Sequence, residues 1–356
     1  MIKDFSYHFY SSTISAWEGM YRAVLGAVKS IYWEIYIFVD DEAGNRFIDL
    51  LCDKAKQGVD VKIIVDAVGS FYLSKIAVNR LRAGGAEVLY FHPLQSEFNL
   101  RAWWLRFRLR NHCKVLLIDE DIAFVGGVNV QYAMENWDDL QLQLTGKVIR
   151  PLARYFARKY IGAGGRKKQV RHLLHPKLTK HIDDVKERIR FITQSPQKFY
   201  PRSSVRQFYR QALASAKENF TLLTPYYAPD KKFLELIYKA SQRGVKVDII
   251  LPFKNDIKLM HYMARAFYGI SKKMGATFYF LKNMNHGKAL TVDNRLGMVG
   301  SANLTNRSYF FNHEANVVFT EQDMVEKLNH ILDDWKNQAD PQLEISMRKP
   351  SLIKKA

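Results

Sequence analysis

The strongest constraint on the fold is that the sequence contains the same pattern twice. The segment 58–66, GVDVKIIVD, is matched in the second half of the chain by 244–252, GVKVDIILP. A chain of 356 residues is long enough for two domains, each with its own core. The repeat therefore predicts a gene duplication that produced two similar units related by a pseudo-two-fold axis.

A second repeated pattern carries reactive side chains. It places histidine, lysine, aspartate, glycine and asparagine at the same intervals in both halves of the chain. The residues are His112, Lys114, Asp119, Gly126 and Asn129 in the first half, and His286, Lys288, Asp293, Gly300 and Asn303 in the second. At average residue frequencies, five such identities arise by chance about once per 10⁶–10⁷ starting positions. Coincidence does not explain finding the pattern twice.

Hydrophobic periodicity predicts an α/β fold. Apolar residues recur at helical spacing from Trp17 to Val28 and give way to a strand-like run at 31–39. Alternation of this kind is typical of a sheet with crossover helices. We expect two duplicated α/β domains, each a mainly parallel mixed sheet flanked by helices. The expected boundaries are 1–165 and 191–340 for the domains, 166–190 for a basic connector and 341–356 for a basic tail.

The spacing of the second pattern predicts a hairpin in each half. Residues 115–118 and 122–125 read as short buried strands joined by a turn. Such a hairpin returns Asn129 to the end of the sheet that carries His112 and Lys114. Asp119 then lies at the far end, where we expect a structural role in holding the turn. Asp293 occupies the same position in the second half.

Two facing halves would place two imidazoles and two ammonium groups around one pocket, a set that suits a phosphodiester. Lysine and asparagine side chains can neutralise and hydrogen-bond the non-bridging oxygens. One neutral histidine can attack phosphorus while a protonated one donates to the leaving alkoxide. This chemistry demands no metal and no cofactor, because the lysines supply the positive field.

Charge and composition limit the classes of binding partner and the cellular compartment that the sequence allows. The formal charge of +19 predicts attraction to a polyanion, either nucleic acid or an anionic membrane. Cys52 and Cys113 are too few for a disulfide framework and point to a reducing compartment. No apolar run approaches the roughly 20 residues that cross a bilayer, and the N-terminus does not read as a secretory signal.

The two repeated blocks resemble the paired signature of the phospholipase D superfamily, and the flanking sequence resembles bacterial cardiolipin synthases. The resemblance extends from about Phe9 to Trp335. Further residues that carry it are Ile37, Phe38 and Asp40, Thr224 to Tyr227, Pro229 and Asp230, Ser301, Leu304, Arg307, Ser308, Asn312 and Glu314.

The resemblance implies roles for individual residues. His112 would be the nucleophile that forms a phosphohistidine, and His286 would protonate the departing alcohol and later activate the incoming one. A carboxylate at a characteristic interval after each histidine would orient it, which assigns Glu314 to His286 and, less closely, Asp139 beside Asp138 to His112. The phosphate-binding and orienting set would be Gly127, Asn129, Asp139, Ser301, Asn303 and Glu314.

The reaction implied by the resemblance joins two phosphatidylglycerol molecules into cardiolipin and releases glycerol. Many cardiolipin synthases begin with two transmembrane helices, which this sequence does not contain. We therefore expect a peripheral protein at the cytoplasmic side of the bacterial inner membrane, with anionic phospholipid as partner and no protein partner implied. The expected membrane contact is Trp103, Trp104, Arg106, Phe107 and Arg108. Residues 259–274 are a second candidate, for which core packing is the better interpretation.

Three other functions stay open at this stage. A lipid hydrolase would use the same residues with water as acceptor. A nucleic-acid phosphodiesterase would fit the charge, but nucleases of this superfamily are often short single-motif chains, so nucleic acid is the less favoured partner. A non-catalytic binder of anionic surfaces is the weakest alternative, because both motifs are whole. His172 and His175 lack a third ligand for a metal site, and Cys113 is expected to be filler rather than a nucleophile.

Overall fold

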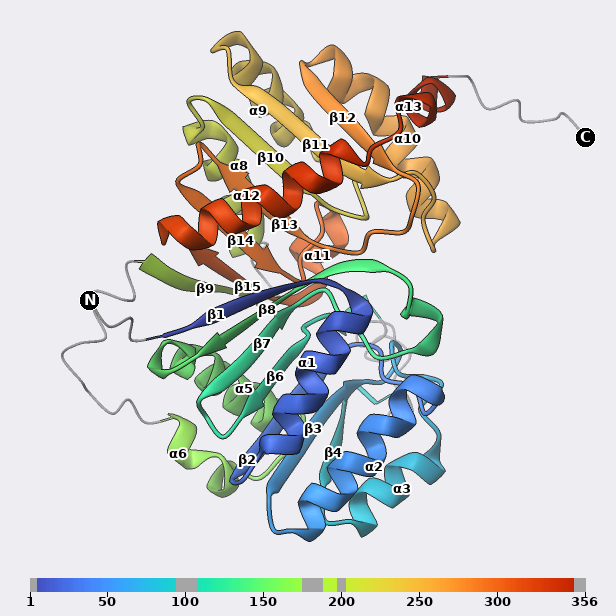
Figure 1. Cartoon of the computed structure of the whole chain (residues 1–356), viewed down its shortest axis with the longest axis vertical. Coiled ribbons are helices and arrows are strands. Elements are labelled where there is room, and N and C mark those ends of the chain that lie inside the picture. Colours follow the sequence, from blue (N-terminus) through green and yellow to red (C-terminus); the bar gives the residue numbers. More distant parts are fainter. Residues whose placement is uncertain (1–4, 94–107, 175–187, 197–202, 349–356) are drawn as a thin grey trace, which may run out of the picture.

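A computed structural model describes residues 5–93, 108–174, 188–196 and 203–348 of the chain. Two α/β halves lie one above the other in Figure 1, the first coloured blue to green and the second yellow to red. Each half contains a mixed sheet covered by helices, as the duplication predicted. Among the described helices, none has the length and apolar character needed to cross a bilayer.

The first sheet has the strand order β1-β8-β7-β6-β2-β3-β4. Only β2, β3 and β4 are parallel to one another, and the other neighbours are antiparallel. The parallel part is smaller than expected because the hairpin and the strand after it also join the sheet. The strands are β1 (Tyr7–Ser12), β2 (Ser30–Ile35), β3 (Asp60–Asp66), β4 (Glu87–Phe91), β6 (Val115–Ile118), β7 (Ile122–Gly126) and β8 (Asp138–Thr145).

The second sheet repeats this order as β12-β11-β10-β13-β14-β15, with β9 paired to β15 where β1 pairs to β8. One short strand from the first half, β5 (Arg110–Asn111), also pairs with β15, in parallel. The remaining strands are β9 (Ile189–Gln194), β10 (Asn219–Leu223), β11 (Lys246–Pro252), β12 (Ala276–Leu281), β13 (Ala289–Val292), β14 (Leu296–Gly300) and β15 (Asn312–Phe319).

Helices cover both sheets, and several begin at side-chain caps. The hydroxyl of Ser74 and the carboxylates of Asp41 and Asp230 accept hydrogen bonds from backbone N–H groups in the first turns of their helices. The α-helices are α1 (Thr13–Gly26), α2 (Glu42–Lys56), α3 (Lys75–Ala83), α5 (Arg150–Gly162), α6 (Arg171–Leu174), α8 (Ser204–Ser215), α9 (Lys231–Gln242), α10 (Lys258–Lys273), α11 (Asn306–Phe310), α12 (Gln322–Asn337) and α13 (Pro341–Arg348). Short 3₁₀ helices are η1 (Tyr132–Met134), η2 (Lys147–Ile149) and η3 (Lys167–Gln169).

The two halves share a hydrophobic core. Each sheet packs one face against its own helices, α1 to α3 in the first half and α8 to α10 in the second. A third cluster runs between the halves and contains Phe156 of α5, Leu328 of α12 and residues from both sheets. The domain limits proposed from the sequence stay predictions, and most of the connector lies outside the described residues. The segment after 340 begins as a packed helix, with Met347 buried in the second half's core.

The hairpins form as predicted, and their aspartates bind backbone at the sheet end away from the histidines. The Asp119 carboxylate accepts hydrogen bonds from the N–H groups of residues 28–30, which lead into β2. Asp293 accepts from those of residues 217–219, which lead into β10. Burial alone would raise the pKa of Asp293, but these three donors hold its pKa below the ordinary value.

Replacing Asp293 by glycine should lower the free energy of unfolding by about 1–3 kcal/mol, because three backbone donors lose a charged acceptor. Glycine is the substitute because Asp293 has a φ of 51°, and Asn294→Gly, at φ 53° in the same turn, is the matched control. Since the folded pKa is depressed, the difference from wild type should be full above the ordinary aspartate pKa of about 4 and shrink as the pH falls below it. Urea unfolding across pH measures this, and equal losses in both variants would contradict it.

Candidate active site

The paired histidines and lysines lie at equivalent places in the two sheets. His112 and Lys114 come just before β6, which is antiparallel to β2, so they lie beyond the carboxyl ends of the parallel strands. His286 and Lys288 precede β13 in the same way. All four side chains are buried. Each lysine Nζ donates to the backbone carbonyl of the histidine two residues before it.

Backbone hydrogen bonds carry each histidine across to the other half. The N–H of His112 donates to the carbonyl of His313 on β15 at 3.0 Å. The N–H of His286 donates to the carbonyl of Asp138 on β8 at 2.6 Å, and the N–H of Asp138 donates to the carbonyl of Met284 at 3.0 Å. Each histidine therefore lies against the strand that follows the hairpin in the opposite half, β15 for His112 and β8 for His286.

The orienting carboxylates are crossed as a result. Nδ1 of His112 lies 3.0 Å from Oε2 of Glu314, and Nδ1 of His286 lies 2.9 Å from Oδ2 of Asp139. The expected assignment, Glu314 to His286 and Asp139 to His112, is wrong. That assignment rests on the number of residues between a histidine and a carboxylate within one half. The backbone pairing instead sets each histidine beside the carboxylate of the other half.

Strand register identifies Asp139, and not its neighbour Asp138, as the counterpart of Glu314. Each carboxylate lies two residues before the residue that pairs with the first glycine of its own motif. These pairs are Gly126 with Gln141 and Gly300 with Asn316. Asp138 contributes backbone hydrogen bonds instead, so the ambiguity left by the sequence is resolved.

Both orienting carboxylates are ionised. Burial would raise the pKa of Glu314, but His112 and Lys114 outweigh it and hold the pKa below its ordinary value. His286 and Lys288 do the same for Asp139. Because a carboxylate only accepts hydrogen bonds, Nδ1 of each histidine carries the proton and Nε2 carries the lone pair.

Gly127 and Ser301 occupy equivalent positions but support their carboxylates differently. The hydroxyl of Ser301 donates to Oε2 of Glu314 at 2.5 Å and accepts from the N–H of Ala315. A Cβ at position 127 would lie 2.0 Å from Oδ1 of Asp139, which leaves room only for glycine. Their lining of a phosphate site stays a prediction.

The two asparagines of the motifs are buried beside the histidine strands. Oδ1 of Asn129 accepts from the N–H of Ile37 at 3.1 Å. The oxygen of Asn129 is thus used within the protein, whereas its Nδ2 group has no protein acceptor within the described part of the chain. In the second half, Oδ1 of Asn303 has no protein donor among the described residues, and the backbone N–H of Asn303 donates to the hydroxyl of Ser308.

Burial shifts the pKa values of the four reactive groups downward, and the charges of neighbouring lysines add to this effect at His112, His286 and Lys288. Burial first, and then the charges of Lys114 and Lys288, lower the pKa of His112 to about 4 against the opposing effect of Glu314. Burial and Lys288 likewise lower the pKa of His286. Burial lowers the pKa of Lys114 to about 8 and that of Lys288 to about 7. Since each lysine acts on the histidine of the other half, the two motifs share one electrostatic environment.

Three aromatic side chains beside the histidines were not identified from the sequence as site residues. The Tyr36 ring lies 4.9 Å from the ring of His112, and the rings of Trp137 and Tyr226 lie 5.7 and 6.2 Å from that of His286. Tyr36 and Tyr226 follow β2 and β10, so their position after a buried parallel strand was the available signal.

The predicted membrane segment is only partly described. Trp103, Trp104, Arg106 and Phe107 lie outside the described residues. Arg108 is exposed, with its guanidinium carbon 4.3 Å from the centroid of the Phe311 ring. Among the described residues, no group of three histidine, cysteine or acidic side chains is placed to hold a metal ion.

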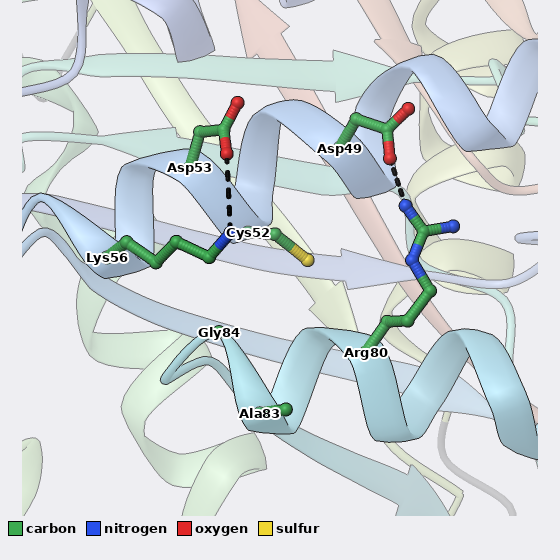
Figure 2. Close-up of a pocket in the computed structure, with 7 residues that line it drawn as sticks. All are labelled: Asp49, Cys52, Asp53, Lys56, Arg80, Ala83 and Gly84. Atoms are coloured by element: carbon green, nitrogen blue, oxygen red, sulfur yellow. Dashed lines mark hydrogen bonds and ion pairs between the residues drawn. The ribbon is translucent and has the colours of Figure 1, made fainter.

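A separate pocket of about 380 Å³ lies between α2 and α3 (Figure 2) and shares no residue with the histidine site. Arg80 pairs with Asp49, and Lys56 lies 3.8 Å from Asp53. The other lining residues are Cys52, Ala83 and Gly84. Because its charged groups pair with one another, we assign no ligand to this pocket.

The crossed pairing predicts which residues couple energetically. In a double-mutant cycle on unfolding free energy, His112→Ala and Glu314→Gln should show a coupling of about 1–3 kcal/mol, because they share a buried charge-assisted hydrogen bond. The matched cycle of His286→Ala with Glu314→Gln should give less than about 0.5 kcal/mol. The reverse order of the two couplings would contradict the crossed arrangement.

Comparison with known proteins agrees with this architecture. Cardiolipin synthase of Geobacillus kaustophilus is 30% identical over 320 residues, which are 87% of this chain and 62% of that protein. Cardiolipin synthase 2 of Bacillus cereus is 28% identical over 354 residues, 96% of this chain and 67% of that protein. This chain thus spans about two thirds of the length of these relatives.

The fold and the family are supported by two further matches. The crystal structure of phosphatidylserine synthase from Haemophilus influenzae has a similar fold, with a TM-score of 0.70 at 14% identity over 95% of this chain and 86% of that one. The family model described as cardiolipin synthase, PLD-like domain, matches residues 21–160 and 209–335, one segment for each half. The chain therefore belongs to the cardiolipin synthase family of phospholipase D-like proteins.

Proposed function

We propose that this chain is a phosphatidyltransferase that makes cardiolipin from two phosphatidylglycerol molecules and releases glycerol. The relatives named cardiolipin synthase support the lipid class. The observation that carries the chemistry is the crossed site, in which two carboxylate-bound histidines from different halves share the field of two buried lysines. A phosphodiester needs such a set: a nucleophile, an acid and cations for its oxygens.

In the first step, Nε2 of His112 attacks the phosphorus of one phosphatidylglycerol. Glu314 holds the Nδ1 proton, which keeps the lone pair on Nε2. The bond from phosphorus to the glycerol oxygen breaks, giving phosphatidyl-His112, and the leaving oxygen takes a proton from His286. Lys114 and Lys288 offset the charge that develops on the non-bridging oxygens, and the Nδ2 group of Asn129 can donate to them.

His286 must be protonated for that step, although burial and Lys288 lower its pKa in the empty site. A bound phosphodiester anion opposes the field of the lysines, so substrate binding favours the protonated imidazole. Asp139 further stabilises the imidazolium through its hydrogen bond to Nδ1.

In the second step, a hydroxyl of another phosphatidylglycerol headgroup takes the place of glycerol. His286 accepts its proton, the oxygen attacks phosphorus, and the bond from phosphorus to Nε2 of His112 breaks. One phosphodiester is exchanged for another, so the reaction balances without a nucleotide. Water in place of the second lipid would give phosphatidic acid by the same steps.

We further propose that the protein works peripherally at the cytoplasmic side of the bacterial inner membrane. Both cysteines are free thiols, which suits a reducing compartment. The formal charge of +19 favours the surface of an anionic bilayer, where phosphatidylglycerol is presented.

Mass spectrometry of products tests this function. Incubation with phosphatidylglycerol should yield cardiolipin and glycerol, and His112→Ala and His286→Ala should each abolish the reaction. His330 is exposed, so the His330→Ala variant should keep wild-type turnover. Phosphatidic acid as the sole product would replace transfer by hydrolysis. Cleavage of single-stranded DNA without any lipid product would contradict the proposal.

The lysine pKa values predict an alkaline limb in the pH profile. As pH rises through about 7 and 8, Lys288 and then Lys114 lose their charge, so kcat/KM on detergent-dispersed phosphatidylglycerol should fall, mainly through a higher KM. Lys288→Arg keeps its charge across this range and should move the limb toward the value of Lys114. A wild-type kcat/KM that stays constant up to about pH 9 would contradict a binding role for these ammonium groups.

A further inference from the structure

Two exposed apolar clusters occupy equivalent positions in the two halves. In the first half, Phe71 and Tyr72 follow β3 and are 68% and 74% exposed, and Ile76 lies exposed in the first turn of α3. In the second half, Leu259 and Tyr262 at the start of α10 are 64% and 60% exposed, and Ile257 lies exposed just before them. We call these the first tip (Phe71, Tyr72, Ile76) and the second tip (Ile257, Leu259, Tyr262).

The second tip corrects part of an expectation from the sequence. Core packing of 259–274 holds for one face of α10, where Ala264, Tyr268 and Ser271 are buried, but Leu259 and Tyr262 at its start are exposed. The helix presents one face to the sheet, and its first turn extends past that face. Both tips follow the carboxyl ends of parallel strands, the edge at which the histidines lie, and α3 and α10 lie on the same side of the molecule in Figure 1.

Hydrogen bonds connect the first tip to the site. Ser70, directly before Phe71, is buried, and its hydroxyl donates to the carbonyl of Tyr36 at 3.0 Å. The ring of Tyr36 packs against His112. The hydroxyl of Ser74 donates to Asp40 at 2.6 Å on the other side of the loop. The loop is therefore fixed at both ends, and Leu73 anchors it in the core, while Phe71 and Tyr72 face solvent.

The second tip is connected in a parallel way. The hydroxyl of Tyr226 donates to the carboxylate of Asp256 at 2.9 Å, and the ring of Tyr226 lies beside His286. Asp256 directly precedes Ile257. In both halves, a tyrosine next to a site histidine is thus hydrogen-bonded to the residue before the tip.

Lysines flank both tips. Lys75 adjoins Ile76, Lys258 lies between Ile257 and Leu259, and Lys254 lies on the loop before them, and all three are exposed. Exposed aromatic and aliphatic groups beside lysines match the interface of a membrane, where rings enter the headgroup region and ammonium groups meet lipid phosphates. Patches rimmed by polar residues also mark protein contacts, but two separate small tips bordering one site fit a continuous lipid surface better than a single protein interface.

We propose that the two tips insert together into the headgroup region of an anionic phospholipid bilayer and hold the site opening against it. The proposal rests on the proposed function for its choice of partner. It explains why the tips are duplicated along with the site: a two-point contact fixes the orientation of the protein, so that a lipid headgroup leaving the bilayer enters between the two histidines.

Vesicle binding tests the tips independently of catalysis. The probe is a vesicle of equal parts phosphatidylcholine and phosphatidylserine, an anionic lipid that is not the proposed substrate. Phe71→Ser with Tyr72→Ser, and Leu259→Ser with Tyr262→Ser, should each weaken co-sedimentation of the full chain at least tenfold. The matched control, Leu25→Ser with Val28→Ser, removes exposed apolar side chains at the far end of the sheet, where the backbone N–H of Val28 donates to Asp119. This control variant should bind vesicles as wild type does.

A labelled single variant provides a second test of insertion if a double variant folds poorly. Both native cysteines are buried, so Tyr72→Cys can carry an environment-sensitive dye whose emission should shift to the blue on vesicles, whereas Val28→Cys should show no shift. Wild-type binding by both tip variants, or no blue shift at position 72, would overturn the proposal. A wild-type dimer in sedimentation velocity that the tip variants dissociate would also overturn it.

Activity separates this proposal from the proposed function. The tip variants should keep wild-type turnover on detergent-dispersed phosphatidylglycerol while losing turnover on vesicles. If wild type binds vesicles through the tips but makes no lipid product, the membrane-contact proposal is supported and the proposed function is contradicted.

Discussion

The site depends on a backbone exchange between the two halves. The strand segment before His112 leaves its own sheet and pairs with β15, and the segment before His286 pairs with β8. A buried ion pair holds the first of these in place: the Arg110 guanidinium lies 3.3 Å from Asp66, which also accepts from the N–H of Asn111 at 2.7 Å. Removing one partner of such a pair leaves a buried charge uncompensated, at about 3–5 kcal/mol. The exchange is therefore secured by side chains as well as by backbone.

The electrostatics of the site follow from this exchange. Each imidazole receives one anionic neighbour from the opposite half and is close to two lysines, and all of these side chains are buried. Burial disfavours every charge there, so the histidines are neutral at pH 7, and the pKa values of the lysines fall to about 8 for Lys114 and about 7 for Lys288. A negatively charged ligand relieves the repulsion among the cations, which is the physical basis for proposing a phosphodiester as substrate.

Much of the fold was accessible from sequence because the duplication and the hairpins are local patterns. The strands expected at 115–118 and 122–125, the second one residue shorter than the observed β7, follow from residues close together in the chain, as do the turn at Asp119 and the counterpart turn at Asp293. The crossed carboxylates were not accessible, because the interval between a histidine and a carboxylate along the chain says nothing about which sheet a strand joins. The exposure of Leu259 and Tyr262 was also missed, since a helical apolar pattern does not reveal how far a helix extends past the sheet it covers.

The two halves have ceased to be identical where they meet. In the second half the hydroxyl of Ser301 donates to Glu314, whereas in the first half Gly127 leaves the space that Asp139 occupies. The two carboxylates are therefore held in different ways. In a dimer of identical subunits every substitution appears on both sides of the symmetry axis, and the two imidazoles are forced to have the same surroundings. A covalent link between the repeats removes that restriction. A single polypeptide can therefore evolve a division of labour across its own pseudo-axis, which no symmetric homodimer can encode.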